Sequence, residues 1–468
     1  MASTRPEQQR LLDFGNEAPM ATAAQEPQGG QSCAAVNGEP ALDSLSEDLM
    51  EQIVAPPNME RAWKAVKANR GAAGPDGMRI ADFPDFIRAH WPRIRQELLD
   101  GSYRPEPVRR KVIPKPDGSG ERMLGIPNVL DRVIQQAVQQ VLTPIFDPEF
   151  SESSFGFRPK RSAHGAVKQV KRYLKQGYRM AVDMDLSKFF DRVQHDVLMS
   201  RVARKVGDRR VLRLIGRYLR AGVMVEGLIQ PTDEGTPQGG PLSPLLANIL
   251  LDDLDKELER RGLRFARYAD DFLILVKTYR SARQVFQSVE RFLTCKLKLV
   301  VNQQKSQVAK TDRICFLGFC FAGHEVRITE KNLQKFKRRV RDITGRSRGI
   351  SMERRLGELR SYLRGWMGYF ALAETKTIFS RLDEWLRRRI RMCYWKQWKR
   401  PRTRIHKLMQ LGVRRDVAIT HGVSRKGYWR LAKTLATNSG MTNRWLLDQG
   451  LVFVRYLWSE LAPLRRTA

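Results

Sequence analysis

Two adjacent aspartates, Asp270 and Asp271, separate two short segments that both have the pattern of β-strands. Apolar and polar residues alternate across residues 264–267, and Phe272–Val276 is an apolar run with the length of a buried strand. A tight turn between these strands would hold both carboxylates at the rim of a sheet. Adjacent carboxylates repel each other, and a divalent ion that prefers oxygen ligands, Mg²⁺ or Mn²⁺, relieves that repulsion. The stretch therefore predicts a β-hairpin with a metal site suited to phosphoryl transfer.

A second acidic cluster lies in a different setting. Asp252, Asp253 and Asp255 fall in a predicted helix, about residues 245–261, whose leucines gather on one side. Acidic residues on the other side of such a helix are expected to form a solvated face. Neighbouring aspartates are thus weak evidence for a metal site unless strands surround them, as they surround Asp270 and Asp271.

A further carboxylate for a metal site is expected from another apolar strand, residues 180–186. Asp183 and Asp185 lie two residues apart and point to the same face of that strand, so the strand period alone does not choose between them. Asp185 opens the pattern Asp-x4-Phe-Asp, which ends at Phe190 and Asp191. With this pattern and the Asp-Asp hairpin, the chain resembles the reverse transcriptases encoded by group II introns.

The resemblance implies an α+β fold of the right-hand polymerase type, with fingers and a palm built on antiparallel sheet, followed by an α-helical thumb or maturase domain. It selects Asp185, with Asp270 and Asp271, as catalytic residues that hold two Mg²⁺ ions, for which Mn²⁺ is a possible substitute. Phe190 falls where related enzymes keep an aromatic residue that blocks a ribose 2′-OH; a plain core aromatic is the alternative. Phe189 is expected to be a core residue.

Two loops are predicted to hold the incoming nucleotide. A hairpin of residues 108–114 and 122–126 flanks a turn-rich loop, in which Lys115 and Arg122 would place two cations on a triphosphate. A solvated basic hairpin is the alternative, and the resemblance favours the triphosphate. Residues 235–244 are rich in Gly and Pro and lead into a helix, so that Gln238 would offer an amide beside the new base pair.

The segment of residues 155–162 interleaves aromatic residues with cations, a composition that can stack on and neutralise a single strand. Arg158 and Lys160 are its candidate nucleic-acid contacts. From the residues alone, an ordinary loop is equally compatible with the segment; the resemblance places a similar segment just before the palm.

Net charge indicates the class of partner. The 468 residues carry a net charge of +34, which favours a polyanion, and no apolar run approaches the length needed to span a membrane. No signal peptide is evident, and the five cysteines form no C-x-x-C pair, so a cytoplasmic protein with reduced thiols is expected. Residues 1–50 hold two Arg and eight Asp or Glu and are predicted to be a disordered tail. A helix is expected to begin after Asn58 as its N-cap.

The strongest basic segment follows residue 330. Residues 331–410 hold 24 Lys or Arg and 6 Asp or Glu, interleaved with Trp, Tyr and Phe along predicted helices. Such helices can pack their aromatic face and lay cations on phosphates; the candidate nucleic-acid contacts are Arg364, Arg387, Arg388 and Arg389. The segments 363–370 and 382–389 also resemble domain X, the thumb and maturase element of group II intron proteins. A solvated charge run is the alternative.

Together these patterns predict a tail at 1–50, fingers at 51–180, a palm at 181–330, a thumb and maturase domain X at 331–405, and a small basic DNA-binding appendix at 406–468. The zinc-stabilised endonuclease of many relatives is not expected, because no cysteine follows Cys393. The implied partners are group II intron RNA, an RNA template with a DNA primer, target DNA and dNTPs. The expected function is RNA-directed DNA synthesis with a maturase role in splicing and retrohoming; the alternative is a host-adopted enzyme of this group that acts in DNA repair or phage defence.

Overall fold

The computed structural model describes residues 48–114, 120–225, 228–230, 235 and 239–461. The predicted tail at residues 1–50 lies almost wholly outside this range. The described residues form two compact units: residues up to 162 with 184–272 and 283–307, and residues 163–183 and 273–282 with those from 308 onward. No described helix has both the length and the apolar character needed to cross a bilayer.

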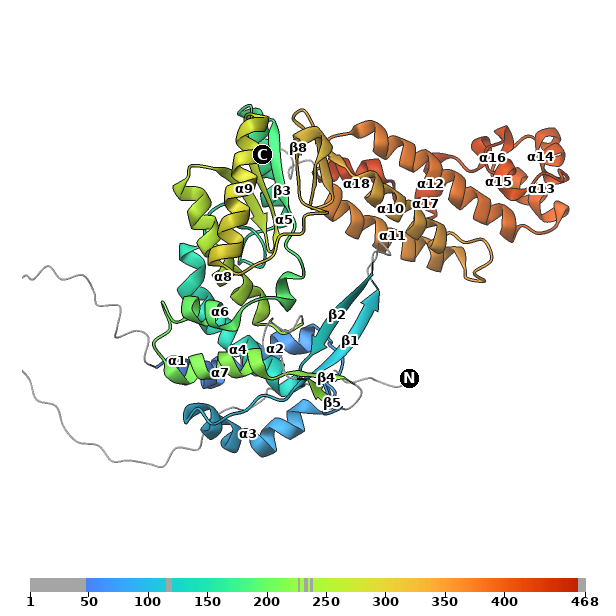
Figure 1. Cartoon of the computed structure of the whole chain (residues 1–468). Coiled ribbons are helices and arrows are strands. Elements are labelled where there is room, and N and C mark those ends of the chain that lie inside the picture. The colour runs from blue at the N-terminus through green and yellow to red at the C-terminus, as the bar shows by residue number, and fades with distance from the viewer. Residues whose placement is uncertain (1–47, 115–119, 226–227, 231–234, 236–238, 462–468) are drawn as a thin grey trace, which may run out of the picture. The chain divides into compact units, whose positions relative to one another are not determined.

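The first unit contains helices that pack on one another and a four-stranded sheet of strand order β2-β1-β4-β5. Strand β1 (Val108–Pro114) pairs antiparallel with β2 (Glu121–Ile126), which confirms the predicted hairpin, drawn as one long ribbon pair in Figure 1. Strands β4 (Val223–Val225) and β5 (Leu228–Gln230) complete the sheet. The helices beside it are α1 (Leu49–Val54), α2 (Pro56–Ala68), α3 (Phe83–Leu99), α4 (Val129–Phe146), α6 (His195–Val202), α7 (Arg209–Arg220) and α8 (Ser243–Arg260).

The predicted start of α2 is wrong. The helix begins at Pro56, because proline is well suited to the first turn, where no backbone N–H is required. Asn58 is therefore inside the helix and buried, and its side-chain amide donates to the carbonyls of Ile53 and Ala137. Asn58 thus ties α2 to α4 instead of capping α2. Helices α2 and α4 each bury an apolar face, which includes Met59 and Trp63 of α2 and Val133 and Val138 of α4.

A second four-stranded sheet has the order β6-β7-β3-β8. Its strands are β6 (Arg264–Tyr268), β7 (Asp271–Val276), β3 (Met180–Met184) and β8 (Gln307–Lys310). Every residue of β7 after Asp271 is buried, as is every residue of β3 except Asp183. Helices α5 (Ala163–Lys175) and α9 (Tyr279–Lys296) and the one-turn helices η1 (Asp147–Glu149), η2 (Phe189–Asp191) and η3 (Thr311–Arg313) lie in the surrounding segments.

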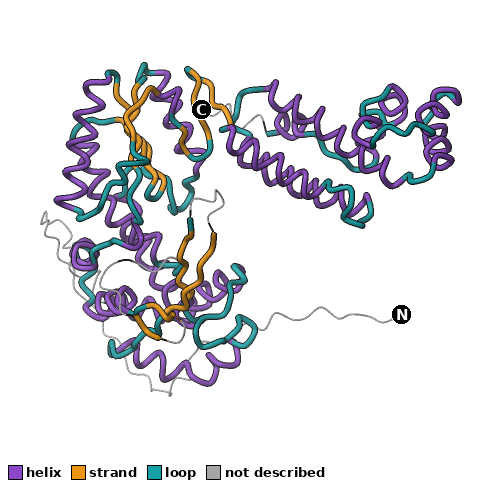
Figure 2. Tube along the Cα trace, turned by 45° about the vertical axis from the view of Figure 1, so that its right-hand side comes forward, coloured by secondary structure: helices purple, strands orange, loops and turns teal. Residues whose placement is uncertain are grey.

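The second unit continues as a small antiparallel sheet followed by helices. Strands β9 (Cys315–Phe316), β10 (Phe319–Ala322) and β11 (Glu325–Ile328) form the sheet. Long helices α10 (Glu330–Ile343), α11 (Met352–Phe370) and α12 (Lys376–Gln397) follow, and Figure 2 shows shorter helices gathered beyond the end of α12. These are α13 (Pro401–Gln410), α14 (Arg415–Gly422), α15 (Tyr428–Leu431) and α16 (Leu435–Gly440); α17 (Asn443–Asp448) and α18 (Val454–Glu460) complete the chain, and α18 packs on α11 and α12. The α+β class and the antiparallel sheets are confirmed.

Candidate functional site

The predicted Asp-Asp hairpin is confirmed. Strands β6 and β7 are joined by a two-residue turn, Ala269 and Asp270, and Asp271 is the first residue of β7. Asp271 is exposed and Asp270 is half-buried, whereas the residues that follow them in β7 are buried. Ala269 has a φ of +59°, a left-handed conformation that costs a residue with a side chain about 1–2 kcal/mol. The buried strands hold a strained turn that presents two carboxylates.

Asp185 follows the end of β3, which is the sheet neighbour of β7. Its backbone is fixed on both sides: the Asp185 amide donates to Ser306 Oγ at 3.0 Å, and its carbonyl accepts from the Asn302 amide at 2.8 Å. Its carboxylate forms an ion pair with Lys305, with Nζ 3.4 Å from Oδ2, and 39% of the Asp185 side chain is exposed. The three predicted carboxylates therefore lie at the ends of neighbouring strands, as the sequence led us to expect.

The donor set suits a hard divalent ion, because all three groups are carboxylates on rigid strand ends. Within the residues that the structure describes, however, no group of three His, Cys, Asp or Glu side chains is arranged to hold a metal ion. Asp185 is instead paired with Lys305, so metal binding would exchange that ion pair for coordination. Lys305 is a residue of the site whose role the sequence did not predict.

The solvated face predicted for Asp252, Asp253 and Asp255 is wrong. Asp255 is fully buried and Asp252 is 9% exposed, while Asp253 forms ion pairs with Arg201 and Arg204. The acids are buried because each finds a cation: Asp252 pairs with Lys256, and Asp255 pairs with Arg267 of strand β6. Burial raises the pKa of the Asp255 carboxyl, and the guanidinium of Arg267 opposes that rise. Helix α8, which carries these acids, therefore packs against strand β6 of the hairpin instead of exposing its acidic side to solvent.

The structure describes only some of the predicted nucleotide-binding residues. Lys115 and Gln238 lie outside the described residues. Arg122 belongs to β2, where its backbone pairs with Ile113, but its side chain is outside the description. Phe190 lies in η2, half-buried, with its ring 5.1 Å from that of Phe189. Phe189 is 3% exposed, which confirms it as a core residue.

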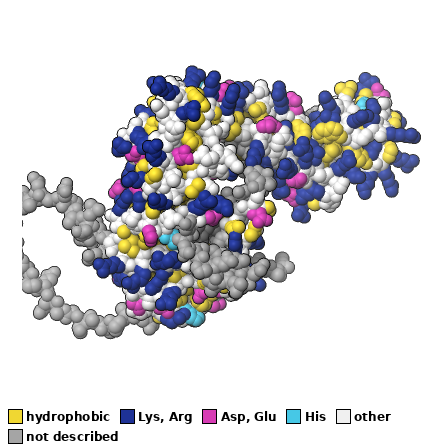
Figure 3. Space-filling model, viewed as in Figure 1, with side chains coloured by type: hydrophobic (Ala, Val, Ile, Leu, Met, Phe, Trp, Pro, Cys, Tyr) yellow, Lys and Arg dark blue, Asp and Glu magenta, His cyan; other side chains and the backbone are white. Residues whose placement is uncertain are grey.

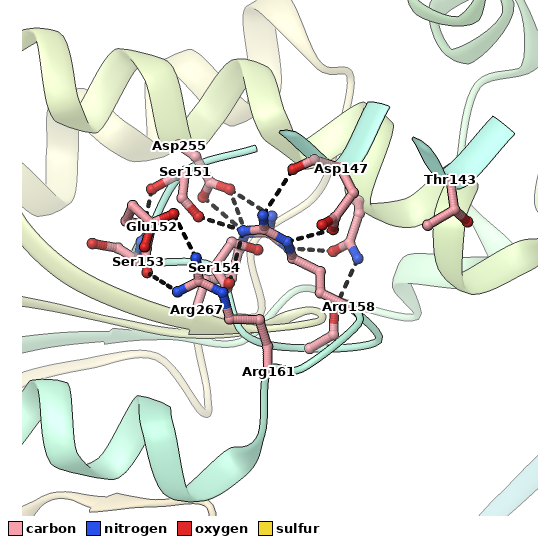
Figure 4. A network of polar contacts seen from close by, with 12 residues as sticks. Thr143, Asp147, Ser151, Glu152, Ser153, Ser154, Arg158, Arg161, Asp255 and Arg267 are labelled. Carbon is pink, nitrogen blue, oxygen red and sulfur yellow. Dashed lines mark hydrogen bonds and ion pairs between the residues drawn. The ribbon is translucent and has the colours of Figure 1, made fainter. Parts of the chain in front are cut away.

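Arg158, a predicted nucleic-acid contact, is held inside the protein. Arg158 is 8% exposed, and its guanidinium donates to the Asp147 carboxylate at 2.7 Å and to the carbonyls of Ser151 and Ser154. A buried arginine finds its partners within the fold, and this one closes the loop that carries it (Figure 4). Lys160 is exposed and stays a predicted contact, and the neighbouring ring of Phe157 is 53% exposed.

Basic side chains cover much of the visible surface over the helices after residue 330 (Figure 3). Arg364 is exposed on α11, as its predicted role requires. Arg389 is held by hydrogen bonds within the protein. Its Nε donates to Thr344 Oγ1 at 2.8 Å, and its Nη2 donates to the carbonyls of Arg341 and Thr344. Arg388 lies 4.0 Å from the centroid of the Trp429 ring and donates twice to the Trp429 carbonyl.

Arg388 thus attaches α15 to α12, and Arg389 attaches α12 to the end of α10, while their contacts with nucleic acid stay predictions. Both arginines lie within α12 and reach elements that the sequence pattern did not bring together with it. Arg387 is half-buried, with its guanidinium 5.7 Å from the centroid of the Phe453 ring, and stays a predicted contact.

A cleft of about 940 Å³ lies between α10 and α11. Its floor includes the stacked rings of Phe336, Tyr362 and Trp366, and its rim includes the exposed cations Lys335 and Arg339. The sequence analysis did not single out these two cations. They lie four residues apart on one helix, and that spacing was the signal that could have placed them on one face.

Two family descriptions match the chain. One, "Reverse transcriptase (RNA-dependent DNA polymerase)", matches residues 113–321, which include all three predicted catalytic aspartates. The other, "Group II intron, maturase-specific domain", matches residues 333–412, the basic helical segment.

Two relatives are similar in sequence to parts of this chain. Protein YkfC of Escherichia coli (strain K12) is 32% identical, over 59% of this chain and 82% of that protein. The group II intron-encoded protein LtrA of Lactococcus lactis subsp. cremoris is 34% identical, over 58% of this chain and 44% of that protein, so the matched part is less than half of LtrA. The solved telomerase from Candida albicans has a TM-score of 0.38 at 12% identity, over 67% of this chain and 64% of that one.

Proposed function

Because the chain belongs to the family of group II intron reverse transcriptases and maturases, we propose that it copies RNA into DNA and that it also binds a group II intron RNA to assist splicing and retrohoming. The reverse transcriptase domain is present in the chain. The proposal concerns which residues perform the reaction and which RNA the helical segment binds.

One observation supports the polymerase site most directly. Asp185 follows strand β3, and Asp270 and Asp271 lie at the β6–β7 turn, on strands that are neighbours in one sheet. Asp271 and Asp185 are open to solvent, unlike Asp255, which is buried against an arginine. Exposed carboxylates on rigid strand ends are what a polymerase site requires, because catalysis of phosphoryl transfer is mostly positioning and charge stabilisation.

In the proposed site, Asp185, Asp270 and Asp271 hold two Mg²⁺ ions beside the primer terminus. When bound, these ions lower the pKa of the primer 3′-hydroxyl and neutralise the pyrophosphate leaving group. Lys115 and Arg122 neutralise the triphosphate of the incoming dNTP. Gln238 faces the new base pair, and Phe190 excludes a ribose 2′-hydroxyl.

The maturase part of the proposal rests on the basic helices. Arg364 on α11 and Lys335 and Arg339 on α10 are exposed cations, and the latter two lie beside the aromatic rings of the cleft. Cations next to the partly exposed rings of Tyr362 and Trp366 suit an RNA strand, because phosphates and bases can be contacted at the same time. We propose that this surface contacts the intron RNA and that the short helices after residue 400 contact target DNA.

Extension of a DNA primer on an RNA template, with dNTPs and Mg²⁺, tests the polymerase. Splicing of the intron RNA encoded beside the gene, at moderate Mg²⁺, tests the maturase. Extension with no effect on splicing would favour the host-adopted enzyme of DNA repair or phage defence. Failure of extension by the intact chain would overturn the polymerase proposal.

A further inference from the structure

Behind the Asp270–Asp271 turn lies a fully buried arginine. Arg267 is in strand β6, two residues before Ala269, and 0% of its side chain is exposed, as is 0% of the Asp255 side chain. Arg267 Nε lies 2.8 Å from Asp255 Oδ1 and Nη2 lies 2.5 Å from Oδ2, a bidentate pair (Figure 4). A buried ion pair of this kind is costly to assemble, and hydrophobic residues often stabilise a fold equally well. Its presence here calls for a reason other than stability.

The third nitrogen of Arg267 supplies that reason. Nη1 donates to the carbonyl oxygen of Ala269 at 3.0 Å and to Asn248 Oδ1 at 2.9 Å. Ala269 is the strained residue of the turn, with its φ of +59°. Strained conformations persist where surrounding contacts enforce them. Arg267 thus connects a rigid helix, through Asp255, to the main chain that positions the two aspartates.

The loop of residues 151–158 restrains the same turn from another side. The amide of Arg267 donates to the Ser153 carbonyl at 2.9 Å, and its carbonyl accepts from the Phe155 amide at 2.8 Å. Gly156 lies against the turn so closely that a Cβ there would be 2.2 Å from the Ala269 nitrogen. Asn248 Nδ2 donates to the Gly156 carbonyl at 2.8 Å, which connects this loop to the Arg267 network.

We propose that Arg267 is a positioning residue for the polymerase reaction: braced by Asp255 and Asn248, it holds the Ala269 carbonyl and so fixes the Asp270–Asp271 turn in the geometry that binds the divalent ions. Arg267 touches neither substrate nor metal and acts through the main chain. The inference rests on the proposed assignment of Asp270 and Asp271 as metal ligands.

Three changes test it in the full-length chain. Arg267→Lys keeps the charge and loses the fork that reaches Ala269. The double change Arg267→Met with Asp255→Leu replaces the ion pair by apolar side chains and protects the fold. Gly156→Ala forces the turn to shift and removes no buried charge. The matched control is Asp253→Asn, which removes ion pairs from the same helix but not from the turn.

Two measurements that do not depend on catalysis accompany the measurement of primer extension. Amide hydrogen exchange of residues 264–276, without metal, should become about tenfold faster in all three test variants and stay unchanged in the control. Binding of Mn²⁺, followed by electron paramagnetic resonance, should weaken about tenfold, as for other changes that disturb the orientation of metal ligands. The rate of primer extension at saturating dNTP should fall roughly 10²-fold, while KM for dNTP changes by less than about threefold.

Equal hydrogen exchange and equal Mn²⁺ affinity in the test variants and the Asp253→Asn control would overturn the inference. Recovery of both by the apolar double variant would also overturn it, because Arg267 would then act only on stability. The Asp271→Asn variant shows whether the inference about Arg267 fails alone or because the proposed metal site is wrong. If Asp271→Asn itself keeps Mn²⁺ binding and extension, the site assignment is wrong.

Discussion

Arginine side chains are buried in different ways in the two parts of the molecule. In the first unit the buried Arg267 and Arg158 each have an acid partner, Asp255 and Asp147, although Arg158 also donates to the Ser151 carbonyl and Arg132 to the Ala72 carbonyl. In the helices after residue 330, Arg355 and Arg391 are held mainly by main-chain carbonyls. Arg355 donates to the carbonyls of Ile343 and Gly345 at 2.8 Å, and Arg391 donates twice to the Met441 carbonyl.

The difference follows from composition. Residues 331–410 have only 6 acids for 24 Lys or Arg, so arginines there use the unpaired carbonyls that every helix leaves at its carboxyl end. Helix α10 ends at Ile343, and Arg355 and Arg389 both donate to carbonyls around that end. A cation is favoured there by the helix dipole as well. A high density of arginine in a sequence therefore does not measure how many arginines face RNA.

The largest effect is expected from Asp271→Asn, which should affect the proposed polymerase site but not the basic helices after residue 330. Primer extension should fall by at least about 10³-fold, because one metal ligand is lost, whereas RNA affinity, which rests on distant cations, should change less than about twofold. Extension kinetics and a filter-binding titration measure the two effects. Extension at the wild-type rate in Mg²⁺ would refute the site assignment.

The next effect concerns Asp131, a buried acid of the first unit that accepts hydrogen bonds from the hydroxyls of Tyr103 and Tyr218. Burial raises its pKa to about 7, despite these hydrogen bonds. Since the folded pKa lies above the unfolded value of about 3.9, the protonated fold is favoured, and its stability should decline as pH rises from about 4 to about 7 by a few kcal/mol.

Asp131→Asn should remove most of that decline and stabilise the protein at pH 8. Chemical denaturation of both proteins at pH 5 and pH 8 measures it. A wild-type stability that rises over this interval while that of the variant does not would contradict the assignment.

Arg389→Ala tests whether carbonyl-bound arginines support the fold. Three hydrogen bonds to Thr344 and Arg341 would be lost, and the free energy of unfolding should fall by about 2 kcal/mol. Arg364→Ala, an exposed control, should change it by less than about 0.5 kcal/mol. Equal free energies of unfolding of the two variants would show that the carbonyl-bound Arg389 stabilises the fold no more than the exposed Arg364.

The smallest effect is expected for exposed cations. Reversing Arg339 and Arg364 to Glu should lower the slope of log affinity against log salt by about 1.4, that is, about 0.7 for each contact with a single strand. Reversal of Arg88 and Arg93, which are exposed on α3 and paired with acids, is the matched control. A slope unchanged by the first pair, or lowered equally by the second, would remove α10 and α11 from the RNA-binding surface.

Local pattern was enough to predict the Asp270–Asp271 hairpin. The alternation before Asp270 and the apolar run after Asp271 each specify a strand, and both strands formed where predicted. The β1–β2 hairpin was predicted from the turn-rich loop between its strands. In both hairpins the pattern that decides the structure is local, within residues 264–276 and 108–126.

For charged side chains, what the sequence did not show has one physical origin. Asp255, Arg158 and Arg389 were each expected to be solvated or to contact RNA, and each has a partner inside the protein. Asp255 and Arg267 are twelve residues apart and Arg389 and Thr344 are forty-five apart, so only the tertiary fold brings them together. Burial of a charge depends on such a partner, and local pattern does not contain it.

Arg355 and Arg389, which donate to carbonyls at the end of α10, also affect the electrostatic potential outside the protein. An arginine paired with a carboxylate is a dipole, whose potential decays quickly with distance. An arginine bound to a carbonyl remains a full positive charge, and its potential reaches as far as the salt allows, about 10 Å at 0.1 M. In the proposed complex, Arg355 and Arg389 would thus contribute to the long-range attraction of a polyanion even without a direct contact. Their effect would be on the rate at which RNA arrives, whereas cations that contact the RNA directly would also affect how fast it dissociates.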